Sequence, residues 1–272
     1  MRHIPRKRFG QHFLTDNSII DAIVRAIDPR PDDRLVEIGP GTGALTGPLL
    51  ARAGRLVAIE LDRDLAPKLS ARYGDALQVV TGDALTVDFG TLVGPGERIR
   101  VVGNLPYNIS SPLLFHLTAF IGSIRDQHFM LQKEVVDRMA AAPGGDMGRL
   151  TTVLQNLYRI DCLLDVPPGA FDPPPKVESS VVRMVPRPAP LTAQIDLLQA
   201  LLASGFSQRR KMLRNTLGKW FARHRPDFDP VMAAERDPRL VPFAEPTRRA
   251  EEIPVAAWCA LADELARVGR PS

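Results

Sequence analysis

The sequence has few of the residues that build metal centres and disulfide frameworks. It contains two cysteines in 272 residues, Cys162 and Cys259, and they stand far apart in the chain. Their separation excludes the close spacing of a zinc-binding or redox-active pair and indicates reduced thiols in a reducing compartment. The five histidines form no metal-binding motif. We therefore expect no metal centre.

Long apolar runs are also missing. No stretch approaches the roughly 20 consecutive apolar residues that cross a bilayer. The basic start of the chain is not followed by an apolar run of signal-peptide length. We therefore expect no membrane partner and a cytoplasmic location.

Aromatic residues make up only 6% of the chain, but hydrophobic residues make up 44%. This content is enough for one large α/β domain with a smaller companion. The formal charge of +4 and a pI near 9.3 permit a polyanionic partner without proving one. Basic residues crowd two segments, and two solvated faces are the alternative explanation. The two sets are Arg2, Arg6, Lys7 and Arg8, and then Arg209, Arg210, Lys211, Arg214, Lys219, Arg223 and Arg225.

Short apolar runs alternate with segments of helical periodicity in the first half of the chain. They lie at residues 35–38, 56–59, 77–80, 99–102 and 129–131. The alternation predicts a parallel sheet with helices on both faces. A further run at 181–185 follows a proline-rich stretch and predicts a reversed hairpin strand at the sheet edge.

A linker is predicted at residues 186–190, where prolines fix an extended path and remove backbone donors. Residues 1–187, with an amino-terminal arm at 1–16, are expected to form the α/β domain. Residues 188–272 form the second domain. Beyond the linker, apolar residues recur at helical spacing over 195–206 and 211–221, and strand signals are absent. The second domain is therefore expected to be a small helical bundle.

A glycine-rich turn follows the first predicted strand. Gly39, Gly41 and Gly43 let the backbone bend tightly and approach a ligand closely, just before a helical segment. A plain strand-to-helix turn and a dinucleotide-binding fold are the alternatives. The G-x-G-x-G spacing departs from the G-x-G-x-x-G of dinucleotide sites, and this departure favours methyl transfer.

Acidic residues follow the next two strands. Glu60, succeeded by Leu61 and Asp62, stands where a carboxylate can accept hydrogen bonds from both hydroxyls of a ribose. This arrangement suits NAD and S-adenosylmethionine equally. Asp83 can accept from the exocyclic amine of an adenine, and Ala84 leaves room for its ring. A surface turn is the alternative for that pair.

The most informative stretch follows the fourth predicted strand and reads Asn104, Leu105, Pro106 and Tyr107. A carboxamide, a proline and an aromatic ring at the end of a buried strand make a planar slot. Open α/β sheets bind ligands at that edge. The slot suits a flat base that carries an amine.

Taken together, these motifs resemble the Rossmann-like S-adenosylmethionine-dependent methyltransferases. More narrowly, they are similar to the ribosomal RNA adenine dimethyltransferases of the KsgA type. Further matching stretches extend the resemblance over nearly the whole chain: RFGQHFL at 8–14, QKEV at 132–135, GRL at 148–150, FDPPPKVES at 171–179, and Phe206 through 209–211 to Leu213 and Asn215. The resemblance implies a class I methyltransferase fold, α/β with a mostly parallel seven-stranded sheet and a small helical carboxyl-terminal domain.

The resemblance also implies a cofactor, S-adenosylmethionine, with S-adenosylhomocysteine as its product. The residues expected to bind it are His12, Leu14 and Gly39 at the methionine portion, Glu60 at the ribose, Asp83 at the adenine and Asn104 beside the sulfonium methyl, with Gly41, Leu61 and Ala84 completing the set. The arm of this family often reads Gly-Gln-Asn-Phe-Leu, and here His12 replaces the asparagine. A histidine adds a group that titrates near neutral pH.

The chemistry expected in the slot follows from the amine of adenine, a poor nucleophile because its lone pair is delocalised into the ring. The side-chain oxygen of Asn104 and the carbonyl of Leu105 are expected to accept its hydrogens, with Pro106 fixing the turn. Tyr107 is expected to stack on the base and Phe171 to form a second plate. For both rings, burial in the core is the alternative.

The substrate implied by the resemblance is 16S ribosomal RNA within the small (30S) subunit. Two adjacent adenosines of its 3′-terminal hairpin loop would become N6,N6-dimethyladenosines, as part of subunit biogenesis. The basic residues expected to hold RNA phosphates are Arg209, Arg210, Lys211 and Arg214. The alternatives are a methyltransferase for large-subunit RNA, an assembly or transcription factor without catalysis, and an NAD-dependent oxidoreductase. A monomer is expected.

Overall fold

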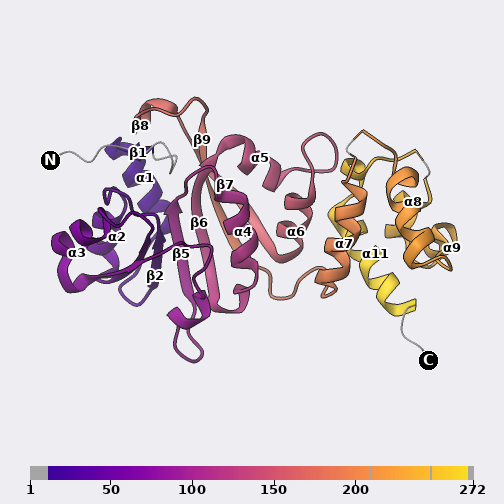
Figure 1. Ribbon diagram of the computed structural model, residues 1–272, viewed down its shortest axis with the longest axis horizontal. Helices are drawn as coiled ribbons and strands as arrows, with labels where there is room; N and C mark the ends of the chain where they lie inside the picture. Colours follow the sequence, from indigo (N-terminus) through magenta and orange to yellow (C-terminus); the bar gives the residue numbers. More distant parts are fainter. Residues whose placement is uncertain (1–11, 209, 246, 269–272) are drawn as a thin grey trace. The chain divides into compact units, whose positions relative to one another are not determined.

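The computed structural model describes residues 12–208, 210–245 and 247–268 (Figure 1). The described chain separates into two compact units. The first unit contains residues 12–136 and 160–186, and the second contains residues 137–159 and 187–268.

These units differ from the predicted domains, 1–187 and 188–272, in one internal stretch. Residues 137–159 include α6 (Arg149–Leu157), which packs on α7 (Ile195–Gly205) and α11 (Val255–Val268) in the second unit. The chain therefore enters the second unit, returns to the first and enters the second again. A boundary drawn from a linker cannot detect such a return, because it assumes that each domain is continuous in sequence.

The first unit is built on a seven-stranded sheet in the order β4-β3-β2-β5-β6-β9-β7. Pairing is parallel from β4 to β6, and β9 pairs antiparallel with β6. The prediction of an α/β fold with a mostly parallel sheet is confirmed. The strands are β2 (Arg34–Ile38), β3 (Leu56–Glu60), β4 (Leu77–Thr81), β5 (Ile99–Asn104), β6 (Ile124–Gln132), β7 (Tyr158–Val166) and β9 (Ser179–Pro186).

The prediction of a reversed strand at 181–185 is confirmed in direction but wrong in position. This strand, β9, lies inside the sheet between β6 and β7 rather than at its edge. The predicted strands do not include β7, although apolar residues recur at every second position from Tyr158 to Val166. Such alternation is typical of a half-buried strand, and only the two ends of β7 are fully buried.

Helices cover the sheet and build the second unit. Those before residue 141 are α1 (Asn17–Ile27), α2 (Thr46–Ala53), α3 (Ala66–Tyr73), α4 (Ser110–Thr118) and α5 (Lys133–Ala140). The others, besides α6, α7 and α11, are α8 (Leu213–His224), α9 (Pro230–Arg236) and α10 (Val241–Ala244). Single 3-10 turns lie at Gly74–Ala76, Phe89–Leu92, Ile121–Ser123, Pro168–Ala170, Pro238–Leu240 and Ala250–Glu252.

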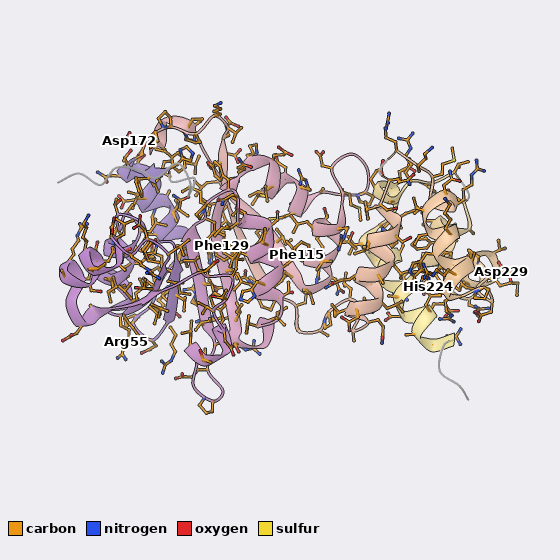
Figure 2. The ribbon with its side chains drawn as sticks, in the orientation of Figure 1. Arg55, Phe115, Phe129, Asp172, His224 and Asp229 are labelled. Carbon is orange, nitrogen blue, oxygen red and sulfur yellow. The ribbon has the colours of Figure 1, made fainter. Side chains whose placement is uncertain are left out.

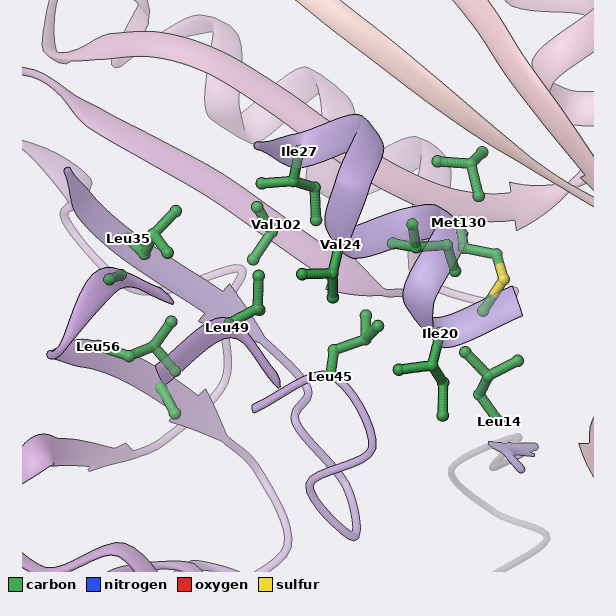
Figure 3. Packing of buried hydrophobic residues seen from close by; sticks show 14 of the residues in the cluster. Leu14, Ile20, Val24, Ile27, Leu35, Leu45, Leu49, Leu56, Val102 and Met130 are labelled. Atoms are coloured by element: carbon green, nitrogen blue, oxygen red, sulfur yellow. The ribbon is translucent and has the colours of Figure 1, made fainter. Parts of the chain in front are cut away.

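The first helix, α1, illustrates how local sequence sets the fold. It begins at the cap Asp16, whose side chain accepts hydrogen bonds from the backbone N–H groups of the first turn. Its buried residues Ile20, Ile23, Val24 and Ile27 recur at helical spacing and face the core. Figure 3 shows this face beside Val102 of β5 and Met130 of β6, so α1 covers that face of the sheet.

A separate two-stranded sheet fixes the start of the described chain. β1 (Phe13–Leu14) pairs antiparallel with β8 (Phe171–Asp172), and the Thr15 N–H donates to the Ala170 carbonyl at 2.8 Å. Leu14 is buried in the main core. The pairing therefore holds residues 12–14 against a segment more than 150 residues later in the chain.

The second unit is helical in its described part, as expected for the carboxyl-terminal region. Beyond β9 the only ladder pairing among described residues is an isolated bridge between Met212 and Arg249. Trp258 of α11 is fully buried, and a Cβ on Gly205 would lie 2.5 Å from its ring. Nowhere in the described ranges is a helix both long and apolar enough to cross a membrane.

Candidate active site

A cavity opens at the carboxyl ends of β2, β3, β4 and β5 in the first unit. Its empty space, counted to the open mouth, is about 1070 Å³. The lining includes all but one of the predicted cofactor and slot residues. They are His12, Leu14, Gly39, Gly41, Glu60, Leu61, Asp83, Ala84, Asn104, Leu105, Pro106 and Tyr107.

The glycine turn forms one wall of this cavity. Gly39 and Gly41 have φ values of +64° and +59°, in the left-handed region that side chains disfavour. A Cβ on Gly41 would also lie 3.1 Å from the ring of Phe13. The turn therefore requires glycine for its conformation and, at Gly41, for its contact with the arm.

Glu60 is anchored by the backbone on both of its carboxylate oxygens. The Gly41 N–H donates to Oε2 at 3.0 Å, and the Asp62 N–H donates to Oε1 at 2.8 Å. Burial raises the pKa of Glu60, and these two hydrogen bonds oppose that rise. Each oxygen keeps a further lone pair, so the fixed carboxylate can accept from a diol.

Glu37 is a cavity residue that the site prediction missed, although it opens the glycine motif. It is buried at 2% exposure, and the Thr46 hydroxyl donates to its Oε2 at 2.7 Å. Burial raises its pKa to about 7, and the nearby Glu60 charge adds to the rise. A charged residue inside the apolar first strand was the available sequence signal, because a buried carboxylate needs a partner.

The opposite wall carries the residues expected at an adenine. Asp83 accepts the Leu85 N–H at 2.9 Å through Oδ1. Ala84 is buried, whereas Leu61 is 49% exposed, an unusually open position for a leucine. A fixed carboxylate thus lies near a small side chain and an exposed apolar surface, as a flat polar ring requires.

The slot begins at Asn104, whose amide is oriented by the arm. Its Nδ2 donates to the carbonyl oxygen of His12 at 3.1 Å, which directs Oδ1 to the other side of the group. The Leu105 N–H donates to the Met130 carbonyl at 3.2 Å, and Pro106 lies in the turn that follows. The backbone on both sides of the amide is therefore fixed.

Tyr107 is held at both its ring and its hydroxyl. Its hydroxyl lies 2.8 Å from the Ser179 hydroxyl, and its ring lies 5.7 Å from the His12 ring at an interplanar angle of 27°. The His12 Nδ1 lies 2.8 Å from the Pro173 carbonyl oxygen. The sequence resemblance supplied these residues separately, but it could not show that His12 joins the arm to both the slot and the 171–179 segment.

Phe171 is the predicted slot residue that the structure does not bring into the cavity. It lies in β8, is only 4% exposed and belongs to the main apolar core. Its pairing with Leu14 of β1 accounts for this position, because the two-stranded sheet covers the core at that point. In this conformation a base cannot stack on the ring.

The predicted RNA-binding residues belong to the second unit. Arg209 lies outside the described residues. Arg210, Lys211 and Arg214 are exposed, but only Arg214 lies on α8, which begins at Leu213. Arg210 and Lys211 precede the helix, so they do not share a helical face with Arg214.

Known proteins resemble this chain along most of its length. The profile of the family described as "Ribosomal RNA adenine dimethylase" matches residues 2–236. The Ribosomal RNA small subunit methyltransferase A of Ralstonia nicotianae is 56% identical over 268 residues, covering 97% of this chain and 91% of that protein.

Solved structures share the fold. A dimethyladenosine transferase from Plasmodium falciparum has a TM-score of 0.75 at 26% identity, with 95% of this chain and 98% of that chain covered. The 23S rRNA methyltransferase ErmE has a TM-score of 0.69 at 25% identity, with 93% and 99% covered. The predicted methyltransferase fold is confirmed. Fold similarity alone does not separate the RNA substrates, whereas sequence identity is much higher with the small-subunit relative.

Proposed function

The chain belongs to the ribosomal RNA adenine dimethylase family, and we propose that it dimethylates N6 of two adjacent adenosines in small-subunit ribosomal RNA, as an S-adenosylmethionine-dependent enzyme. The observation that carries the proposal is the Asn104 amide, held by the arm at the rim of a cavity with anchored carboxylates. An assembly factor without catalysis would not need this arrangement. A role in subunit biogenesis follows from the substrate.

The cavity residues fit S-adenosylmethionine, a cation with a ribose and an adenine. Glu60 presents two fixed oxygens for the ribose hydroxyls. Asp83 and Leu61 offer an acceptor and an apolar surface for the adenine, and the Gly39 turn allows close approach of the methionine portion. Two buried carboxylates, Glu37 and Glu60, favour a positively charged ligand.

Bound in this cavity, S-adenosylmethionine supplies an electrophilic methyl group on a positively charged sulfur. The Asn104 Oδ1 and the Leu105 carbonyl accept the two hydrogens of the adenine amine, so that its nitrogen becomes more tetrahedral and its lone pair is directed to the methyl group. Pro106 keeps both acceptors in place. As the nitrogen–carbon bond forms, the electrons of the carbon–sulfur bond would remain on sulfur. The newly methylated nitrogen is positively charged and acidic, and it loses a proton to water or to a carbonyl. Positioning therefore provides much of the rate enhancement.

Tyr107 provides the flat surface on which the target base stacks, a contact worth roughly 1–3 kcal/mol. Its hydroxyl bond to Ser179 and its stacking on His12 keep the ring in one plane. The target adenosine has to leave its helical stack or come from a loop to reach this ring. Phe171 can act as a second plate only after a movement that exposes it.

Exposed basic residues of the second unit are proposed to hold the RNA. Arg210, Lys211 and Arg214, with Arg209, bind phosphates and orient the substrate, and they take no part in the methyl transfer. We also propose that the enzyme acts as a monomer in the cytoplasm, where ribosomal subunits are assembled.

One assay tests this function against its rivals. The protein is incubated with labelled S-adenosylmethionine and either small or large ribosomal subunits that lack their methylations, and modified positions are mapped. Label at two adjacent adenosines of small-subunit RNA is expected. Label on large subunits alone would overturn the substrate assignment. Binding to small subunits without methylation at saturating cofactor would favour the assembly factor.

A further inference from the structure

A second cavity lies in the first unit, at the amino-terminal ends of β5 and β6. Its empty space, counted to the open mouth, is about 630 Å³. Since the proposed active site lies at the carboxyl ends of the parallel strands, the second cavity belongs to the opposite edge of the sheet. Its lining is mostly charged and consists of Ala26, Ile27, Asp28, Arg30, Arg100, Arg125, Asp126, His128 and Arg183.

Four of these residues come from three neighbouring strands. Arg100 of β5 pairs in register with Asp126 of β6, and His128 of β6 pairs with Arg183 of β9. Asp126 and His128 are two positions apart on one strand, so their side chains share a face. The carboxyl end of α1 closes the cavity, where the Arg100 Nη2 donates to the Ile27 carbonyl at 2.6 Å.

The carboxylates around the cavity already have partners. Asp33 binds Arg100 at 2.6 Å and Arg125 at 2.9 Å, and Asp126 binds the Arg100 Nε at 3.0 Å. Burial by itself would raise the pKa of Asp126, but the nearby His128 ring and the Arg100 guanidinium, which donates to it, hold the pKa below its ordinary value, so this group is ionised.

Three of the four arginines that line the cavity are paired with carboxylates. The exposed pair of Arg30 and Asp28, 2.6 Å apart, is balanced. Arg100 and Arg125 are balanced by Asp33 and Asp126. Arg183 is the remaining cation of the lining, and among the described residues its buried Nε has no hydrogen-bond partner. A buried donor of a charged group is costly when it stays unpaired.

His128 is the second unsatisfied group. It is 2% exposed, and within the described chain neither ring nitrogen has a hydrogen-bond partner. Its Nδ1 lies 3.4 Å from the Asp126 Oδ1, close enough for charge attraction but too long for a strong hydrogen bond. His128 and Arg183 therefore place two unsatisfied nitrogen-bearing groups opposite each other across β6 and β9.

We propose that this second cavity binds a phosphate group, which accepts hydrogen bonds from the Arg183 guanidinium and from a ring N–H of His128. A guanidinium suits the oxygens of a phosphate in geometry and charge. The group is either free inorganic phosphate or a phosphate of the RNA backbone.

The first experiment titrates the whole protein with sodium phosphate by calorimetry and by thermal unfolding, with sodium chloride at equal ionic strength as the reference. Wild type is expected to bind phosphate and to be stabilised more by phosphate than by chloride. Arg183→Gln is expected to weaken phosphate binding at least tenfold. Arg55→Gln is the control, since Arg55 is an exposed arginine directly before β3 (Figure 2) and does not line the cavity.

The proposal is overturned if phosphate acts on wild type no differently from chloride, because water then satisfies these groups. It is also overturned if folded Arg183→Gln binds phosphate as tightly as wild type. If Arg183→Gln does not fold, Arg183→Lys replaces it. That variant keeps the charge but loses the Nε–H, and several-fold weaker binding is expected.

A second experiment distinguishes the two sources of the phosphate. A rise in KM for small ribosomal subunits in Arg183→Gln with unchanged kcat, and competition by free phosphate in wild type, identify the RNA backbone. Unchanged kinetics together with lost phosphate binding identify the free ion. Because phosphate binding is measured without turnover, its failure is separable from failure of the proposed methyl transfer.

Discussion

Gly103 and Ile38 meet through a backbone contact that leaves no room for a side chain. A Cβ on Gly103 would lie 2.5 Å from the carbonyl oxygen of Ile38. Ile38 precedes the glycine turn, and Gly103 precedes Asn104. This contact therefore sets the distance between the wall of the cofactor cavity and the slot for the base.

Gly103→Ala is expected to force these two strand ends apart. Overpacking of this kind costs about 1–3 kcal/mol of unfolding free energy, and the displaced slot is expected to lower kcat at least tenfold. Chemical denaturation and single-turnover methylation measure the two effects. Gly122→Ala is the control, since a Cβ there meets nothing within 4 Å. Equal activity of both variants would show that the contact does not position the slot.

Asn104→Ala is expected to lower kcat by roughly a hundredfold, the scale seen when a positioned hydrogen-bonding group is removed from an active site. Cofactor affinity, measured by calorimetry, is expected to change little. Asn104→Asp keeps an acceptor oxygen but loses the donor to the His12 carbonyl, so it separates the two roles. Asn108→Ala, at an exposed position of the same rim, is the control. Wild-type transfer rates in Asn104→Ala would disprove the proposed role of the amide.

The hydrogen bond between Tyr107 and Ser179 is expected to orient the stacking ring. A double-mutant cycle with Tyr107→Phe and Ser179→Ala should give a coupling of about 0.5–1.5 kcal/mol in kcat/KM for RNA. Ser180→Ala is a matched control, because the Ser180 hydroxyl instead donates to the Leu164 carbonyl. Additive effects on kcat/KM would mean that the bond serves only folding.

Phe171→Leu decides between a core position and a stacking plate. If the ring acts in the core, leucine preserves most of the packing, the stability loss stays below about 1.5 kcal/mol and methylation continues. This is the result expected from its 4% exposure. Stability and kcat are measured on the same preparation. A stable Phe171→Leu variant without activity would instead require that the ring becomes exposed during catalysis.

Glu37→Gln is expected to change the pH dependence of stability. The pKa of Glu37 rises from 4.5 to about 7 on folding, so the folded protein holds this proton more tightly than the unfolded chain. Its effect on stability is absent below pH 4.5, grows as the pH rises, and is fully unfavourable above about pH 7, where it amounts to about 3 kcal/mol.

The glutamine variant lacks this titration but keeps an acceptor for Thr46. Without cofactor, its stability relative to wild type should therefore increase from pH 5 to pH 8, as measured by urea unfolding. A difference that is constant across this range would show that Glu37 does not titrate there. Thr86→Val, a substitution away from Glu37 and Glu60, is the control, and its stability relative to wild type is expected not to change with pH.

The parallel strands could be predicted because each contains a short apolar run and most are followed by a helix, and burial on both faces preserves the apolar run in the central strands. The cavity could be predicted in outline because parallel strands place their carboxyl ends at one edge. The strand β7 could also have been predicted, from the alternation of apolar residues over Tyr158–Val166. The return of residues 137–159 to the second unit could not be predicted, because it depends on packing between distant segments and leaves no local pattern.

Individual site residues show the same limit. Glu60 and Asp83 lie at the cavity where their motifs indicated, because Glu60 ends β3 and Asp83 closely follows β4. Phe171 was assigned from a motif, but its burial depends on pairing with β1 at the other end of the chain. The bond between Asn104 and the His12 carbonyl likewise joins segments that no local pattern connects.

The pairing of β1 with β8 also has a consequence for the order of events during synthesis. Phe13 and Leu14 leave the ribosome early, but their partner strand ends at Asp172. Chains are made from the amino terminus at a finite rate, and contacts between distant segments form late. The arm therefore cannot dock until more than half of the chain has been synthesised, and the cofactor pocket is completed only after that point.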